Sequence, residues 1–378
     1  MSGIISKEHR LVNLKNIKKY TPGFNIHDIQ KKYKLKKVIK LASNENPFVS
    51  NDVLSFIKNS NHKLNLYPES NPDELHKLLA DTVGHRMTRN NIILGNGSNE
   101  ILEFIVRANV DNKSEVIIPK HSFLVYEIIS KLQNAKIIVT KPDNDKASEN
   151  YLGINLESVI KKITKKTKLI FIANPANPTG TYIDLSEIDN FLQSVPKNTS
   201  VIIDEAYYEY LNPKINKTAV SLINKYKNLY VTRSFSKIYG LASLRVGYGI
   251  SSRDNISILK NYKQPFNSNL FAQKAALLAL KDFKFTRVSK ENNDIARIKL
   301  TKLFNSLSID YLGTYCNFIT FRAGKRSKQL FQYLLKNGVI VRPLTNYGLT
   351  DYLRVSLGTP HDNNIFIKHM KLFYSDKI

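Results

Sequence analysis

The sequence contains no tryptophan and only one cysteine, Cys316, among its 378 residues. One cysteine cannot form a disulfide within the chain, which excludes a small disulfide-stabilised scaffold and favours a reducing compartment. Glycine and proline are also scarce, at 15 and 13 residues, which excludes collagen-like and low-complexity chains. No apolar run reaches the length of a signal peptide core or a membrane span, so we expect a cytoplasmic globular protein without a membrane partner.

Acidic residues are few, because 31 Asp and Glu stand against 57 Lys and Arg, giving a formal charge of +26. A surplus of this size suggests an anionic partner such as nucleic acid or a phosphorylated substrate. The lysines are spread along the whole chain, however, and no zinc-finger, helix-turn-helix or RNA-recognition motif accompanies them. We therefore expect a lysine-rich solvated surface and no specific nucleic-acid partner.

Short β-branched runs alternate with longer amphipathic segments from about residue 91 to residue 250. The runs occupy residues 92–94, 116–118, 137–139, 169–172, 201–203, 229–231 and 246–250. Unbroken apolar runs are typical of strands buried on both faces, so the pattern predicts an α/β fold with a mostly parallel seven-stranded sheet.

The alternation of apolar runs and amphipathic segments changes after residue 265. Two amphipathic helices are predicted over residues 269–281 and 289–307, followed by strands over 318–321, 339–341 and 353–356. We expect a large domain over residues 48–265, a smaller α/β domain over 266–378, and an N-terminal arm over 1–47 that packs on the smaller domain.

Charged and hydroxylated residues follow two of the runs, where ligands bind in open α/β sheets. Asp204 ends one run, and a buried carboxylate there needs a cation, either a structural salt bridge or a protonated ring nitrogen. Lys237 follows another run, beside Ser234 and Ser236 and near Arg245. These groups could bind a phosphate while the lysine amine, its pKa lowered by nearby cations, reacts with a carbonyl. The alternative, a solvated surface lysine, fits these small and hydroxylated surroundings poorly.

Two turns carry weaker signals. Residues 95–99, Gly-Asn-Gly-Ser-Asn, open a helix that Ser98 or Asn99 is expected to cap, and its free N–H groups favour an anion. Glycines are equally common in purely structural turns. In residues 174–180, Asn-Pro-Ala-Asn-Pro-Thr-Gly, two prolines stiffen the backbone and orient the Asn177 amide, either for a ligand or merely as a rigid connection.

Together these motifs resemble the fold-type I family of pyridoxal-phosphate enzymes and, within it, the histidinol-phosphate aminotransferases. The resemblance covers nearly the whole chain, with the motifs in the same order. They are Tyr20-Thr-Pro-Gly23, Lys40-Leu-Ala-Ser-Asn-Glu-Asn-Pro47, Leu66-Tyr67-Pro68, residues 174–180, Asp204 to Tyr207, residues 234–248, Arg342-Pro343 and Leu353-Arg354-Val355. The resemblance implies that the large domain binds pyridoxal 5'-phosphate.

The resemblance also implies roles for the matching residues. Lys237 would hold the cofactor as a Schiff base and then move a proton between the substrate Cα and the cofactor C4′. Asp204 would keep the pyridine nitrogen protonated, and Asn177 and Tyr207 would bind the ring O3′. The cofactor phosphate would be bound by Ser98, Asn99, Ser234, Ser236 and Arg245.

Two aromatic residues complete this implied cofactor site. Phe123 matches the aromatic residue that stacks on the cofactor ring. Tyr67 matches a residue that reaches the phosphate of the neighbouring subunit's cofactor, so the resemblance implies a homodimer. No metal site is expected.

Substrate choice would depend on two arginines and a tyrosine. Arg354 matches the residue that binds the α-carboxylate of glutamate or 2-oxoglutarate. Arg342 and Tyr20 match residues that contact the phosphate of histidinol phosphate or the side-chain carboxylate of glutamate. The resemblance thus implies a ping-pong transaminase that interconverts histidinol phosphate and 2-oxoglutarate with imidazole-acetol phosphate and glutamate, in histidine biosynthesis.

Four alternatives remain open from the sequence. An aromatic-amino-acid aminotransferase or a threonine-phosphate decarboxylase would use the same cofactor apparatus. From another class, the chain could be a pyridoxal-phosphate-binding regulator or a basic nucleic-acid binder. Three departures from the family pattern, Ala176 for Asn, Ser243 for Gly and Asn99 for Asp, affect local geometry rather than a proposed catalytic group.

Overall fold

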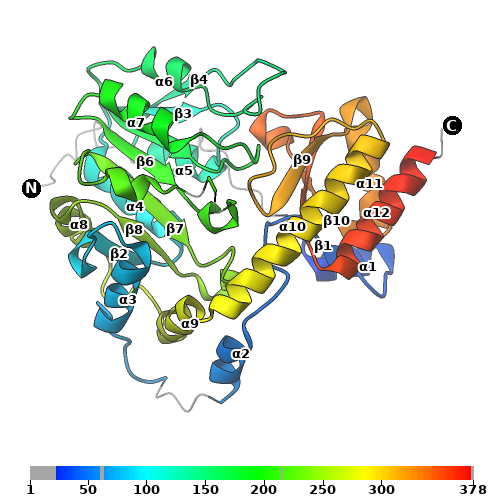
Figure 1. Ribbon diagram of the computed structural model, residues 1–378, viewed down its shortest axis with the longest axis horizontal. Helices are drawn as coiled ribbons and strands as arrows, with labels where there is room; N and C mark the ends of the chain where they lie inside the picture. The colour runs from blue at the N-terminus through cyan, green and yellow to red at the C-terminus, as the bar shows by residue number, and fades with distance from the viewer. Residues whose placement is uncertain (1–22, 60–63, 213, 216, 376–378) are drawn as a thin grey trace, which may run out of the picture.

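The computed structural model of the chain describes residues 23–59, 64–212, 214–215 and 217–375. Two lobes, each built around its own β-structure, are connected by the long helix α10 (Phe283–Ser306), which extends from one lobe to the other (Figure 1). The larger lobe contains a seven-stranded sheet in the order β2-β8-β7-β6-β5-β3-β4. Its strands are β2 (Ile92–Gly95), β3 (Glu115–Pro119), β4 (Lys136–Thr140), β5 (Thr167–Ala173), β6 (Ser200–Asp204), β7 (Leu229–Ser234) and β8 (Gly247–Ile250).

This sheet confirms the predicted mostly parallel seven-stranded arrangement. Strand β8 runs antiparallel to its neighbours β2 and β7, and the remaining pairs are parallel. Successive side chains point to opposite faces, so Ile117 enters one hydrophobic core while Val116 and Ile118 enter the other. Both faces are therefore buried, which explains the unbroken apolar runs.

Helices cover the two faces of the sheet and make three layers. The side chains of α4 (Ser98–Asn109), α5 (Leu124–Leu132) and α8 (Arg253–Lys260) pack into one core. The opposite core receives α2 (Asn51–Lys58), α3 (Asp73–Val83), α6 (Leu156–Ile160), α7 (Leu185–Ser194) and α9 (Leu270–Lys281). The carboxyl ends of the parallel strands remain open toward the smaller lobe.

The smaller lobe has a third core and two short sheets. One sheet has the order β11-β12-β9 and the other pairs β1 with β10. Helices α1, α11 and α12 and part of α10 pack around them. The elements are α1 (Ile26–Tyr33), β1 (Ile39–Lys40), β9 (Phe318–Arg322), α11 (Ser327–Lys336), β10 (Val339–Ile340), β11 (Arg342–Pro343), β12 (Tyr352–Ser356) and α12 (Pro360–Ser375).

The described part of the N-terminal arm packs on this smaller lobe. Strand β1 pairs in parallel with β10, and Ile29 and Leu41 are buried in the third core. Helix α9 follows residue 265, and its Ala272 and Ala276 lie in a core of the large sheet. The domain limits at residues 47 and 265 stay predictions.

Helix boundaries follow capping residues. The helix predicted over 269–281 is α9, whereas the one predicted from residue 289 is α10, which already begins at Phe283. The Asp282 carboxylate accepts the Phe285 N–H at 2.9 Å, and this cap starts the helix directly after α9. Within the described residues, no helix combines the length and the apolar character that a membrane crossing requires.

Candidate active site

A cavity of about 270 Å³ lies where the parallel strands end. The last residues of β5, β6 and β7, which are Ala173, Asp204 and Ser234, all line it. The smaller lobe contributes Arg342 and Arg354 from the other side. Most of the predicted site residues line this one cavity, namely Ser98, Asn99, Phe123, Asn177, Asp204, Tyr207, Ser234, Ser236, Lys237, Arg245, Arg342 and Arg354.

Lys237 is held in an environment that favours its neutral amine. Its Nζ lies 3.5 Å from the Ser43 carbonyl oxygen and 5.5 Å from the centroid of the Tyr207 ring. Burial, together with the positive charges of Arg354 and Arg245, lowers the pKa of Lys237 to about 8. A substantial fraction of the amine is therefore unprotonated near neutral pH and able to attack a carbonyl.

Asp204, at the end of β6, is only 6% exposed. The Tyr126 hydroxyl donates to its Oδ2 at 2.6 Å, and the Thr232 hydroxyl donates to its Oδ1 at 3.0 Å. Burial raises the pKa of Asp204, while these two hydrogen bonds act to lower it. Because both donors are neutral hydroxyl groups, a cationic ring nitrogen in the cavity would offset the cost of burying this carboxylate.

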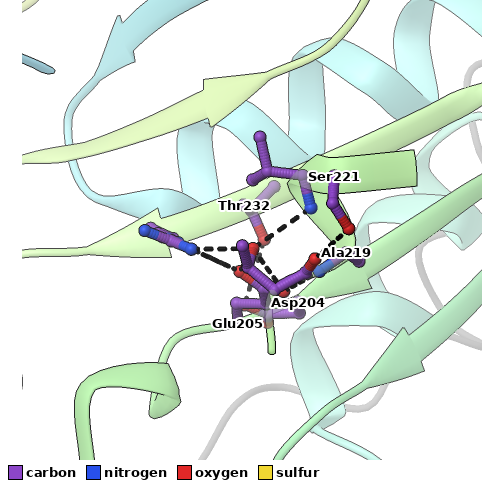
Figure 2. A network of polar contacts seen from close by, with 8 residues as sticks. Asp204, Glu205, Ala219, Ser221 and Thr232 are labelled. Carbon is purple, nitrogen blue, oxygen red and sulfur yellow. Dashed lines mark hydrogen bonds and ion pairs between the residues drawn. The ribbon is translucent and has the colours of Figure 1, made fainter. Parts of the chain in front are cut away.

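The adjacent carboxylate, Glu205, lies in the same polar network as Asp204 but has side-chain partners of its own (Figure 2). It forms an ion pair with Arg233 at 2.9 Å, and the two side chains are 3% and 5% exposed. The Thr218 hydroxyl at 2.8 Å and the Ala219 N–H at 2.7 Å also donate to it. Glu205 is thus fully engaged in joining the ends of β6 and β7, so of these two adjacent carboxylates it is Asp204 that is available to a ligand.

Tyr207 and Asn177 both line the cavity, and each has one side-chain hydrogen-bond partner there. The Asn44 Nδ2 donates to the Tyr207 hydroxyl oxygen at 2.9 Å, and burial raises the pKa of Tyr207. The Arg354 Nη1 donates to the Asn177 Oδ1 at 2.5 Å, and its Nη2 donates to the Ala42 carbonyl at 3.0 Å. The buried Arg354 Nε has no hydrogen-bond partner in the described part of the chain, so this guanidinium retains a donor for a ligand.

Arg342 and Arg354 stand directly opposite each other in the β11–β12 pair. Residues paired in this way project from the same face of a sheet, and two like charges in these positions repel each other. Both arginines are buried and line the cavity. A ligand with negative groups at two positions would remove this repulsion, as a dicarboxylate or a phosphate ester does.

An anion-binding recess lies at the start of α4. Gly97, with φ +81°, is the N-cap residue, so Ser98 and Asn99 begin the helix and the prediction that one of them caps it is wrong. A Cβ atom on Gly97 would lie 2.5 Å from the Arg245 guanidinium, which therefore needs a glycine there. Arg245 Nη1 donates to the Ser236 hydroxyl at 3.3 Å, so the guanidinium, the hydroxyl and the helix N–H groups converge.

Two predicted residues do not lie at this cavity within the described chain. Tyr20 falls outside the described residues. Tyr67 is 81% exposed, stacks on Phe266 with a ring separation of 4.6 Å, and does not line the cavity. Its predicted contact with a neighbouring subunit stays a prediction.

Sequence reasoning missed several residues that shape the cavity. Tyr126 reaches Asp204 from α5, and its ring meets Phe123 edge-on at 5.6 Å. Asn44 and Glu45 also line the cavity, and Tyr347 closes it from the smaller lobe. Asn44 and Glu45 lie in the motif Lys40-Leu-Ala-Ser-Asn-Glu-Asn-Pro47, which could have identified them. No local signal distinguishes Tyr126 from an ordinary core tyrosine.

Comparison with known proteins agrees with this geometry. A family model described as "Aminotransferase class I and II" matches residues 36–370. A histidinol-phosphate aminotransferase 1 from Idiomarina loihiensis is 39% identical over 96% of this chain and 97% of that protein. A histidinol-phosphate aminotransferase 2 from Haemophilus influenzae strain Rd is 36% identical over 93% of this chain and 94% of that protein.

Solved structures show the same fold. The histidinol-phosphate aminotransferase of Clostridium acetobutylicum has a TM-score of 0.80 and 26% identity, covering 90% of this chain and 100% of that chain. That of Sinorhizobium meliloti, solved in complex with pyridoxal-5'-phosphate, has a TM-score of 0.85 and 20% identity over 99% and 100% of the two chains. The chain belongs to the class I and II aminotransferase family and, within it, to the histidinol-phosphate aminotransferases.

Proposed function

We propose that this protein is a pyridoxal-phosphate-dependent aminotransferase that interconverts histidinol phosphate and 2-oxoglutarate with imidazole-acetol phosphate and glutamate, in histidine biosynthesis. The observation that carries the proposal is the facing pair Arg342 and Arg354 at the cavity that also holds Lys237 and Asp204. This pair matches the two anionic groups of glutamate, and Arg342 also matches the phosphate of histidinol phosphate. The names of the full-length relatives support the same substrates.

The residues present fit pyridoxal phosphate. When bound, the cofactor supplies a carbonyl that accepts an amino group and a protonated ring that stabilises negative charge at the substrate Cα. We assign the cofactor aldehyde to the Lys237 amine, the pyridine nitrogen to Asp204, and O3′ to Tyr207 and Asn177. The phosphate site is assigned to the convergent donors Ser98, Asn99, Ser234, Ser236 and Arg245, and the ring face to Phe123.

Lys237 has a second role in this proposal. Once the substrate amine displaces it, its neutral amine becomes a free base beside the substrate Cα. A pKa of about 8 places it near the optimum for taking a proton at Cα and returning it at C4′. Burial of the amine therefore serves both steps.

The substrates would bind between the two lobes. Arg354, whose Nε has no hydrogen-bond partner among the described residues, is assigned to the α-carboxylate of glutamate. Arg342 is assigned to the side-chain carboxylate of glutamate or the phosphate of histidinol phosphate, together with the predicted Tyr20. Because one cavity serves both substrates, the reaction follows a ping-pong order in which the first product leaves before the second substrate binds.

The homodimer is part of the same proposal. Leu64, Leu66 and Tyr67 form an exposed apolar segment, with 75%, 60% and 81% of each residue accessible. We propose that a second copy covers this segment and that Tyr67 reaches its cofactor phosphate. We further propose a cytoplasmic location, which suits the one cysteine, Cys316, buried and unpaired.

A spectral titration tests the proposed substrates. The pyridoxal-phosphate form is titrated separately with histidinol phosphate, phenylalanine, tyrosine and threonine phosphate, and conversion to the pyridoxamine form is followed by absorbance. We expect conversion at the lowest concentration with histidinol phosphate. A preference for phenylalanine or tyrosine would keep the cofactor assignment and replace the substrate by an aromatic amino acid.

A further inference from the structure

The cavity contains one carboxylate for which the proposed reaction has no role. Six of the described lining residues are charged, four basic and two acidic, and they are Lys237, Arg245, Arg342, Arg354, Asp204 and Glu45. Asp204 faces the assigned pyridine nitrogen, Lys237 is assigned to the cofactor aldehyde, and the three arginines face anionic groups. Glu45 is left without an assigned partner on the ligand.

The backbone on both sides of Glu45 is fixed. Asn44 has a left-handed conformation with φ +55°, and its side chain donates to Tyr207 at 2.9 Å. The Asn46 side chain donates to the Ile238 carbonyl, next to Lys237, at 2.7 Å. Glu45 is therefore held beside the reactive lysine and does not lie on a freely moving loop.

The negative charge of Glu45 influences the pKa of Lys237, and the positive charge of Lys40 screens it. Its carboxylate acts to raise the pKa of Lys237, against the larger effect of burial. The Lys40 Nζ lies 2.6 Å from the Glu45 Oε1, and the two side chains are 27% and 40% exposed. The carboxylate thus has a neighbouring cation and is still open to the cavity.

The two proposed substrates differ in what they offer this carboxylate. Glutamate carries two carboxylates and no hydrogen-bond donor apart from its amine. Histidinol phosphate carries an imidazole ring, which has an N–H donor and gains a positive charge near pH 6.5. A carboxylate accepts a hydrogen bond from this ring and repels the carboxylates of glutamate.

We propose that Glu45 binds the imidazole ring of histidinol phosphate, and that Lys40 screens its charge when glutamate occupies the cavity. The inference rests on the proposed function, because it assigns one more part of the same substrate. Glu45 is a specificity-determining residue in this account. It selects the imidazole substrate, while the arginines bind the anionic groups common to both substrates.

The test uses the spectral half-reaction on the loaded enzyme with Glu45→Ala and Lys40→Ala. For Glu45→Ala, we expect the concentration of histidinol phosphate at half conversion to rise about 10- to 100-fold, the range for a hydrogen bond to a charged group. The value for glutamate should stay the same or fall. Lys40→Ala should instead raise the concentration of glutamate at half conversion about threefold or more, because the Glu45 carboxylate then repels the carboxylates of glutamate without screening.

Two further samples separate this inference from other effects. Glu45→Gln keeps the shape of the side chain and a neutral hydrogen-bond acceptor. Its concentration of histidinol phosphate at half conversion should therefore lie between the values for the wild type and Glu45→Ala. The circular dichroism spectrum and the stoichiometry of bound cofactor, which should be the same in each variant, report whether the protein has kept its structure.

The outcomes distinguish the inference from the function on which it rests. If the wild type does not respond to histidinol phosphate, the proposed substrate is wrong and the role of Glu45 falls with it. If the wild type responds but Glu45→Ala affects histidinol phosphate and glutamate equally, or neither, only the role of Glu45 is overturned.

Discussion

Lys237 illustrates how burial and charge set the reactivity of one side chain. The lysine amine has a pKa of about 8 because it is buried beside Arg354 and Arg245. The protonated amine cannot attack an aldehyde, so the rate at which cofactor-free protein captures pyridoxal phosphate depends on the neutral fraction. The pH dependence of this capture rate therefore reports the pKa of Lys237.

We predict that this capture rate rises about tenfold per pH unit below pH 8 and levels off above it. Arg354→Met should move the break to higher pH, because loss of the neighbouring cation raises the pKa of Lys237. Stopped-flow absorbance across pH 6 to 10 checks both statements. A break at the same pH in both proteins would mean that Arg354 does not influence the amine.

Tyr126 gives a second test at the residue scale. Tyr126→Phe removes the hydrogen bond at 2.6 Å that favours ionised Asp204, so the pKa of Asp204 rises further and fewer molecules pair with a protonated pyridine nitrogen. We expect pyridoxal phosphate to bind roughly tenfold more weakly, the lower end for a hydrogen bond to a charged group. Tyr230→Phe, which removes the hydroxyl of a buried tyrosine on β7 that does not line the cavity, should bind the cofactor normally. Equal affinity in all three proteins would contradict the role of Tyr126.

The sequence predicts the reactive residues better than the residues that position them. Lys237 and Asp204 stand next to apolar runs, so their places at strand ends follow from the chain itself. The contact between Tyr126 and Asp204 joins residues 78 apart, and that between Asn44 and Tyr207 joins residues 163 apart. Such contacts depend on how helices pack on the sheet, which local patterns do not specify.

At the scale of elements, the start of α4 shows where local rules fail. Serine and asparagine are common helix caps, so the sequence predicts Ser98 or Asn99, but Gly97 takes this position with φ +81°. The close approach of Arg245 leaves no room for a side chain there. A tertiary contact therefore overrides the local capping preference, and it does so to bring a cation to the helix N-terminus.

Gly97→Ala tests this arrangement. The positive φ and the clash with Arg245 should lower the free energy of unfolding by about 1–3 kcal/mol and weaken cofactor binding. Gly84→Ala is a matched control, because Gly84 also has a positive φ of +69° but no atom within 4 Å of the added Cβ. Chemical denaturation and cofactor titration of both variants should show lost stability in each and lost cofactor affinity only in Gly97→Ala. Weaker cofactor binding in both would assign the effect to backbone strain alone.

At the scale of the whole molecule, the cavity combines elements from both lobes. Strands β5 to β7 bring Lys237, Asp204 and Ser234 to one edge of the large sheet, while β11 and β12 bring the paired arginines from the smaller lobe. The proposed dimer adds Tyr67 from a second copy. Each active site would then draw on three structural units.

Mixing two inactive variants tests this shared site. Tyr67→Ala and Lys237→Ala should each have little activity as homodimers. Random reassociation of an equal mixture makes about half of the dimers mixed, and each mixed dimer has one site with both native residues. Activity should therefore recover to about a quarter of the wild-type level. No recovery, with two different affinity tags on the subunits confirming mixed dimers, would show that Tyr67 acts only within its own subunit.

The most direct test of the central claim is to locate the cofactor on the chain. Purified protein loaded with pyridoxal phosphate should be yellow, and borohydride reduction followed by peptide mass spectrometry should find the cofactor on Lys237. The Lys237→Ala variant, treated in the same way, should carry no label and show no multiple turnover. A label on another lysine, or sustained turnover in Lys237→Ala, would contradict the account.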